Sequence, residues 1–154
     1  MKIFLSSIIG TLFILLTGCA KHNAFKQFHM SATQERNEDN IQTFKIKKDK
    51  SIHGIVTVVY LNKVFPKIYK DNEYFYVYYY LKDKDEKASF FLNNRNSLLR
   101  EKLTKENKFA KLTSFQAPWS NYYLIGFQKE DNILNLTVKT NKAASATLQF
   151  IKDK

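Results

Sequence analysis

Few side chains in this sequence are of the types that carry out covalent or metal chemistry. The chain of 154 residues has one cysteine, Cys19, and three histidines, His22, His29 and His53. A metal site needs several His, Cys or carboxylate ligands at suitable spacing, and no such spacing surrounds the histidines. Nucleophilic catalysis needs a serine or cysteine beside a base, and the sequence has no Gly-x-Ser-x-Gly or Ser-x-x-Lys motif. We therefore expect no catalytic residue, metal or cofactor, and we do not expect an enzyme.

Cys19 follows a segment with the layout of a signal peptide. Lys2 gives a positive start, residues 3–16 form an apolar run, and Thr17 and Gly18 are small. As a helix, the run spans about 21 Å, which is short of the roughly 30 Å of hydrocarbon in a membrane. A permanent transmembrane helix is therefore disfavoured, and a segment that directs export is expected.

Residues Leu16-Thr17-Gly18-Cys19 resemble the lipobox of bacterial lipoproteins, which ends in a cysteine. The resemblance implies cleavage after Gly18, a diacylglycerol on Cys19 and acyl chains such as palmitate that hold the protein on the membrane. A lone cysteine fits this role, because an exported protein would otherwise carry an unpaired thiol into an oxidising compartment. A buried, inert Cys19 and an uncleaved anchor are the alternatives. Position 20 holds Ala in place of the Asp that would signal inner-membrane retention. In this respect the sequence resembles lipoproteins that are sorted to a Gram-negative outer membrane.

The chain as a whole has the composition of one globular domain. Hydrophobic residues make up 44% and aromatic residues 15%, with only 4 Gly and 2 Pro, which excludes collagen-like and disordered chains. We expect a signal peptide over 1–18, a lipidated N-terminus and flexible tether over 19–40, and a folded domain over 41–154. The alternative for the tether is a short helix over 24–36.

Alternation of apolar and polar residues with a period of two predicts strands throughout the folded domain. The predicted strands cover residues 41–48, 52–61, 73–82, 88–92, 121–127, 133–140 and 143–151. The last three are expected to form an antiparallel meander. Many short strands without helical crossovers predict an all-β fold, a single antiparallel β-sandwich of immunoglobulin-like type. For residues 97–106, a short helix beginning at Ser97 competes with a loop and a short strand.

Four tyrosines form the most unusual pattern in the sequence. Tyr74, Tyr76, Tyr78 and Tyr80 occupy alternate positions of one predicted strand, so they share one face. Tyrosine combines a stiff apolar ring with a polar tip, and such a face could bind a glycan or a peptide. The alternative is that the rings pack under a neighbouring strand. Trp119 is expected to close one end of the sandwich.

Positive charge is concentrated early in the folded domain. The chain has a formal net charge of +11, and residues 41–70 hold seven lysines against one acidic residue. Near anionic headgroups each lysine contributes about 1 kcal/mol to membrane binding. The alternative is that these lysines form a solvated, lysine-rich face. Only three arginines are present, which argues against nucleic acid. The candidate contacts to an anionic surface are Lys45, Lys47, Lys48, Lys63 and Lys67.

These patterns predict a bacterial envelope lipoprotein, held on the membrane through Cys19, that acts as a non-enzymatic binding or accessory module for another envelope protein. The alternative is a lysine-rich module that binds anionic lipid or an envelope polymer, and an enzyme is the weakest hypothesis. An edge strand open to an added strand would favour the protein partner. A continuous basic face would favour the polyanion, and a cleft with an acid and a histidine would favour an enzyme.

Overall fold

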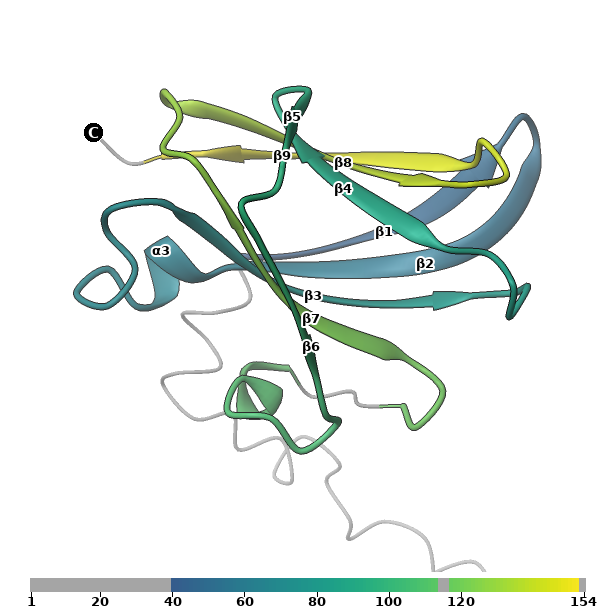
Figure 1. Ribbon diagram of the computed structural model, residues 1–154, viewed down its shortest axis with the longest axis horizontal. Coiled ribbons are helices and arrows are strands. Elements are labelled where there is room, and N and C mark those ends of the chain that lie inside the picture. The colour runs from purple at the N-terminus through teal and green to yellow at the C-terminus, as the bar shows by residue number, and fades with distance from the viewer. Residues whose placement is uncertain (1–39, 114–116, 153–154) are drawn as a thin grey trace, which may run out of the picture. The chain divides into compact units, whose positions relative to one another are not determined.

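The computed structural model describes residues 40–113 and 117–152. The strands in these ranges belong to one nine-stranded antiparallel sheet with the order β5-β4-β8-β9-β1-β2-β3-β7-β6 (Figure 1). The elements are β1 (Ile41–Lys48), β2 (Ser51–Tyr60), the helical turn α3 (Leu61–Val64), β3 (Glu73–Leu81), β4 (Ala88–Leu92), β5 (Arg95–Asn96), β6 (Leu99–Leu103), the 3₁₀ turn η2 (Ala110–Leu112), β7 (Asn121–Phe127), β8 (Ile133–Thr140) and β9 (Ser145–Ile151). The predicted signal peptide, Cys19 and the tether lie outside the described residues.

The prediction of an all-β fold is confirmed, but the strands form a single curled sheet in place of the two sheets of an immunoglobulin-like sandwich. The curl follows from chain connectivity. β5 and β6 stand at opposite ends of the strand order, yet only Ser97 and Leu98 separate them in the chain. At this junction the guanidinium of Arg100 in β6 lies 5.3 Å from the centroid of the Phe90 ring in β4 and 4.7 Å from that of Tyr123 in β7. This cation–π contact joins the two edges of the sheet.

In the C-terminal half, one local prediction was wrong and one open alternative is decided. β7 does not form a meander with β8 and β9, because β7 pairs with β3 and β6 while β8 pairs with β4 and β9. Most of β7 is buried, whereas β8 alternates between buried and partly exposed residues. A strand that is apolar on both faces belongs where both faces are covered, which is beside β3. For residues 97–106 the short-strand alternative holds, since residues 99–103 form β6 and pair along the outer edge of β7.

The curled sheet encloses a core on its inner face, and a second core lies on its outer face. The inner core confirms the alternation predicted for β8 and β9, since Leu134, Leu136 and Leu148 are fully buried there. The outer core lies on β2, β3 and β7 and includes Phe109 and Leu112 from the segment around η2. β3 therefore has apolar neighbours on both of its faces, which explains its nearly continuous aromatic sequence.

Candidate functional site

The four tyrosines of β3 do not form an open binding platform. Tyr76 is 0% exposed and Tyr78 is also buried in the outer core, whereas Tyr80 at the end of the row is 42% exposed. The face is covered because the segment around Phe109 returns over it, with ring centroids of Tyr76 and Phe109 5.4 Å apart. The packing alternative therefore holds for Tyr76 and Tyr78, and Tyr74 is half-buried against the same core. Only Tyr80 retains an accessible ring.

Burial also changes the acidity of these rings. It raises the pKa of Tyr76 to about 12, an effect that the hydrogen bond donated by the Asn107 side-chain amide at 3.3 Å opposes. On the inner face of β3, burial raises the pKa of Tyr79 to about 12 as well, and the neighbouring Tyr123 adds to the shift. Both rings are therefore held in the neutral form by their surroundings.

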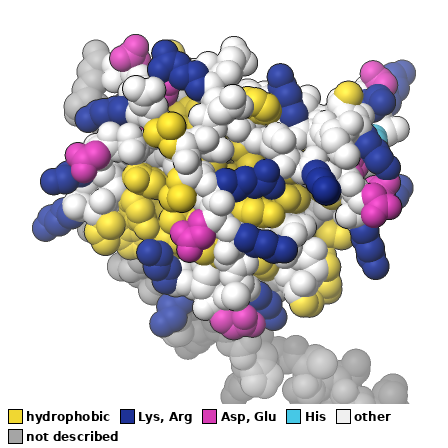
Figure 2. Space-filling view, viewed as in Figure 1, with side chains coloured by type: hydrophobic (Ala, Val, Ile, Leu, Met, Phe, Trp, Pro, Cys, Tyr) yellow, Lys and Arg dark blue, Asp and Glu magenta, His cyan; other side chains and the backbone are white. Residues whose placement is uncertain are grey.

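The structure spreads the five early lysines along the length of β2. Lys47 and Lys48 lie opposite its first residues and Lys45 lies opposite Ile55 near its middle. Lys63 and Lys67 lie in and after α3, beyond the other end of β2. The ten residues of β2 span about 30 Å. On the face shown in Figure 2, Lys and Arg side chains are spread out, with hydrophobic and uncharged surface between them. These lysines therefore do not make the one continuous basic face that would favour the polyanion.

Trp119 is also placed differently from the prediction. Its side chain is 63% exposed, and it does not close an end of a sandwich. Trp119 lies in a turn that the Ser120 backbone N–H closes by donating to the carbonyl oxygen of Ala117 at 3.1 Å. The Tyr122 hydroxyl donates to the same oxygen at 2.8 Å, so Ala117 and Tyr122 are buried while the tryptophan is at the surface.

The backbone pairing of the sheet is almost interrupted between β1 and β9. Lys47 and Ser145 are the only Cα partners between these strands in the described chain, whereas every residue of β1 has a partner in β2. From that point the two strands diverge (Figure 1). Across the opening, the side-chain amide of Gln42 donates to the carbonyl oxygen of Gln149 at 2.7 Å. We call the opening between residues 41–45 and 146–151 the β1–β9 seam.

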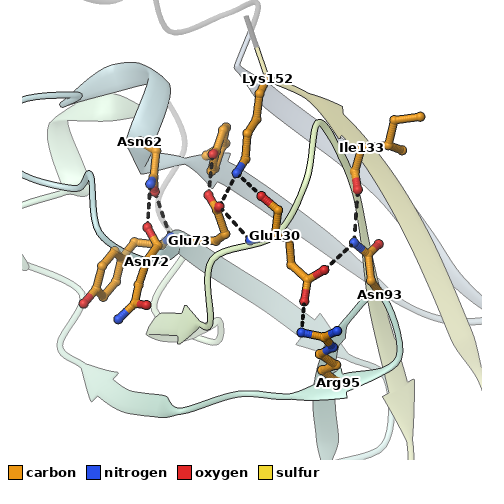
Figure 3. Close-up of polar contacts among 10 residues, drawn as sticks. Asn62, Asn72, Glu73, Asn93, Arg95, Glu130, Ile133 and Lys152 are labelled. Carbon is orange, nitrogen blue, oxygen red and sulfur yellow. Dashed lines mark hydrogen bonds and ion pairs between the residues drawn. The ribbon is translucent and has the colours of Figure 1, made fainter. Parts of the chain in front are cut away.

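A buried carboxylate lies at the start of β3. Glu73 is 1% exposed, and its oxygens accept hydrogen bonds from the Tyr60 hydroxyl at 2.6 Å and from the Glu130 backbone N–H at 3.2 Å. The ammonium group of Lys152 pairs with the same carboxylate and also donates to the carbonyl oxygen of Glu130 (Figure 3). Because a buried charge is costly unless it is paired and hydrogen-bonded, these contacts tie the end of β9 to β2, β3 and the β7–β8 connection.

The Glu130 side chain points away from this carboxylate. It accepts from Arg95 at 3.1 Å and from the Asn93 side-chain amide at 3.2 Å (Figure 3). Asn93 and Asn94 both have positive φ angles, 47° and 67°, the left-handed conformation that a two-residue hairpin turn requires and that asparagine tolerates. Sequence reasoning missed this network, because its residues are far apart in the chain and carry no shared motif.

A second buried carboxylate lies at the opposite end of β2. The pairing of β1 with β2 passes from Ile46 opposite Gly54 to Lys47 opposite Ile52, so His53 is the extra residue of a β-bulge. A bulge redirects the side chain that it carries. Here the His53 Nδ1 lies 3.3 Å from Glu86, a buried residue that also accepts a hydrogen bond from the Thr140 hydroxyl.

The His53–Glu86 pair borders a hollow of about 680 Å³ that Ser51 and Lys142 also line. Lys142 forms an exposed ion pair with Asp83 there, and its hydrogen bond lowers the pKa of Asp83 while the same contact raises the pKa of Lys142. An acid and a histidine in one cleft is the arrangement that would favour an enzyme. Within the described chain, however, no hydroxyl or thiol is hydrogen-bonded to this imidazole, so the pair has no activated nucleophile.

Residues 40–113 and 117–152 contain no group of three or more His, Cys, Asp or Glu side chains placed to bind a metal ion. In the same ranges, the helical segments are all too short or too polar to cross a membrane. Comparisons of the chain with protein-family models, with curated proteins and with solved structures find no match.

Proposed function

We propose that this protein is a membrane-anchored lipoprotein of the bacterial envelope that acts as a non-enzymatic binding module for another envelope protein. The lipobox-like residues that end in Cys19 support the anchor, and Ala20 supports the outer membrane where the host has one. The binding role is supported by one observation above all, the β1–β9 seam, where two neighbouring strands leave backbone edges without a partner in the described chain.

An extended segment of a partner protein can add to such an edge. The carbonyl oxygen of Asn40 accepts from the backbone N–H of Tyr60 in β2, and successive residues of a strand direct their backbone groups to opposite edges. The N–H and C=O groups of Ile41, Thr43 and Lys45 are therefore directed toward the seam. Main-chain hydrogen bonds to an added strand give affinity, and alternate side chains give specificity.

The side chains of β1 indicate the chemistry of the partner. Lys45 and Lys47 lie on one face of β1, and the partly exposed Phe44 lies on the other. An added strand would place its own side chains beside them, with opposite charges and apolar pairs stabilising the contact. We therefore expect the partner segment to alternate acidic and apolar residues. Lysines on a free edge also discourage pairing with strands that lack negative charge.

Site-specific photocrosslinking in intact cells tests the seam. A photoreactive phenylalanine analogue in place of Phe44 should give one discrete adduct with an envelope protein. The same analogue in place of Tyr80 is the matched control, because both side chains are aromatic and 42% exposed. Tyr80 lies on β3, so β2 separates it from the seam, and its side chain is on the face of the sheet opposite to that of Phe44. No adduct at position 44, or the same adduct from both positions, would contradict the proposal.

Metabolic labelling tests the anchor separately. The Cys19→Ala variant should incorporate no labelled palmitate and should accumulate as a precursor or in the wrong fraction, because the lipidated side chain is gone. Labelling of the variant at the level of the parent would contradict the lipoprotein assignment. The alternative function, a lysine-rich module for anionic lipid or polymer, lacks the support of a continuous basic face, since Lys47 lies opposite the start of β2 and Lys63 lies beyond its last residue.

A further inference from the structure

A cleft of about 360 Å³ opens beside the buried Glu73, at the end of the sheet that carries α3. Its walls come from the α3 region, from the start of β3, from the β7–β8 connection and from the last residues of the chain that the structure describes. Pro66 and Tyr69 give it an apolar side. Its volume lies within the range of small-ligand sites, about 300–1,000 Å³.

Lysines from three separate segments line this cleft, together with a single carboxylate among the described residues. They are Lys63, Lys70, Lys129 and Lys152, and the carboxylate is Glu73. Lys152 neutralises Glu73 by direct pairing. Lys70 and Lys129 add positive charge to the cleft, since Glu73 is the only carboxylate among the described residues that line it. The Glu130 side chain, next to Lys129 in the β7–β8 connection, is directed toward Arg95 and Asn93 (Figure 3) and does not offset that charge.

We propose that this cleft binds a phosphate ester, in the form of a polyol phosphate or a phospholipid headgroup. Lysine ammonium groups act as point charges and bind phosphate well, whereas planar recognition of a carboxylate uses the arginine fork. The arginines of the described chain, Arg95 and Arg100, do not line the cleft. The apolar side formed by Pro66 and Tyr69 fits the carbon skeleton of such an ester. This site shares no residue with the β1–β9 seam, and the proposal does not rest on the proposed function.

Calorimetric titration of the full-length protein in detergent with glycerol 3-phosphate tests the site. The parent should bind it and should bind glycerol and citrate at least tenfold more weakly. The double variant Lys70→Gln and Lys129→Gln should lose about tenfold in affinity for each lysine removed. The matched control is Lys48→Gln with Lys102→Gln, which removes the same charge from exposed lysines outside the cleft and should leave the affinity unchanged.

Thermal melting shows whether the variants keep the fold, which is expected because Lys70 and Lys129 are exposed. Titration with a water-soluble, short-chain phosphatidylglycerol under the same conditions then distinguishes the two sources of the ester, because vesicle flotation would report the proposed acyl anchor on Cys19. Binding of this lipid that Lys70→Gln with Lys129→Gln abolishes assigns a headgroup, and binding of glycerol 3-phosphate alone assigns a soluble polyol phosphate. Absence of glycerol 3-phosphate binding by the parent, equal binding of citrate, or equal loss in the control variant would overturn the proposal.

Discussion

Replacing Tyr76 with alanine tests whether the tyrosine face of β3 is part of the core. Tyr76 is 0% exposed, and its ring centroid lies 5.4 Å from that of Phe109, 5.8 Å from that of Tyr78 and 6.4 Å from that of Tyr122. Tyr80 lies on the same face of the same strand but is 42% exposed. The substitution Tyr80→Ala is therefore the matched control.

The expected magnitudes follow from burial. Truncating a buried aromatic ring to alanine costs about 3–5 kcal/mol, because contacts are lost and a cavity remains. Tyr76→Phe keeps the ring and removes only the hydroxyl that accepts from Asn107 at 3.3 Å, a bond that contributes about 0.5–1.5 kcal/mol. Tyr80→Ala should cost less than about 1 kcal/mol, as is usual for surface positions. The predicted order of destabilisation is thus Tyr76→Ala, then Tyr76→Phe or Tyr80→Ala.

Urea denaturation followed by far-ultraviolet circular dichroism measures these differences. With an m value of about 1–3 kcal/mol per molar urea, Tyr76→Ala should lower the midpoint by at least about 1 M while the m value stays constant. If Tyr76→Ala unfolds at the same midpoint as the parent, or if Tyr80→Ala is destabilised as strongly, the tyrosine face is not core and the reasoning from burial is refuted.

Three further measurements address the rest of the fold. Burial raises the pKa of Tyr76 and Tyr79 to about 12 from the ordinary 10.0, so their contribution to stability is complete below about pH 10 and is lost as the pH rises toward 12. The absorbance of tyrosinate should therefore show some tyrosines that ionise late. A single transition near pH 10 in the folded protein would contradict this. Leu136→Ala should lose about 2–5 kcal/mol in thermal or urea unfolding, because the side chain is fully buried, and parental stability would argue against the inner core. Gly54→Ala should cost about 1–3 kcal/mol, because a Cβ there would lie 2.2 Å from the carbonyl oxygen of Tyr80; an unaffected melting temperature would mean that the bulge beside it adapts freely.

The local pattern of the sequence was enough to predict most of the strands and the orientation of their side chains. In β8 and β9, residues such as Leu134, Leu136 and Phe150 face the core as the period of two predicts. A period-two pattern is a property of neighbouring residues, and it specifies which side chains share a face before any partner strand is known. The all-β class follows from the same pattern.

Strand neighbours were decided only in the tertiary structure. Because β7 and β8 are consecutive in the chain, their order predicts that they pair with each other. In the structure β7 lies beside β3, because β3 and β7 are both apolar on two faces and need a core on each side. The same arrangement buries Tyr76 under Phe109, which is 33 positions later in the chain and which no local pattern connects to it.

The candidate sites also come from contacts between distant residues. Glu73 and Lys152 pair although 79 positions separate them, and His53 meets Glu86 because a bulge redirects its side chain. The sequence by itself determined which residues are charged and which faces are apolar. Only the folded sheet decided where the early lysines lie, with Lys47 opposite the start of β2 and Lys63 beyond its end. Strand pairing depends on how well all apolar faces are buried together, and that is a property of the whole domain.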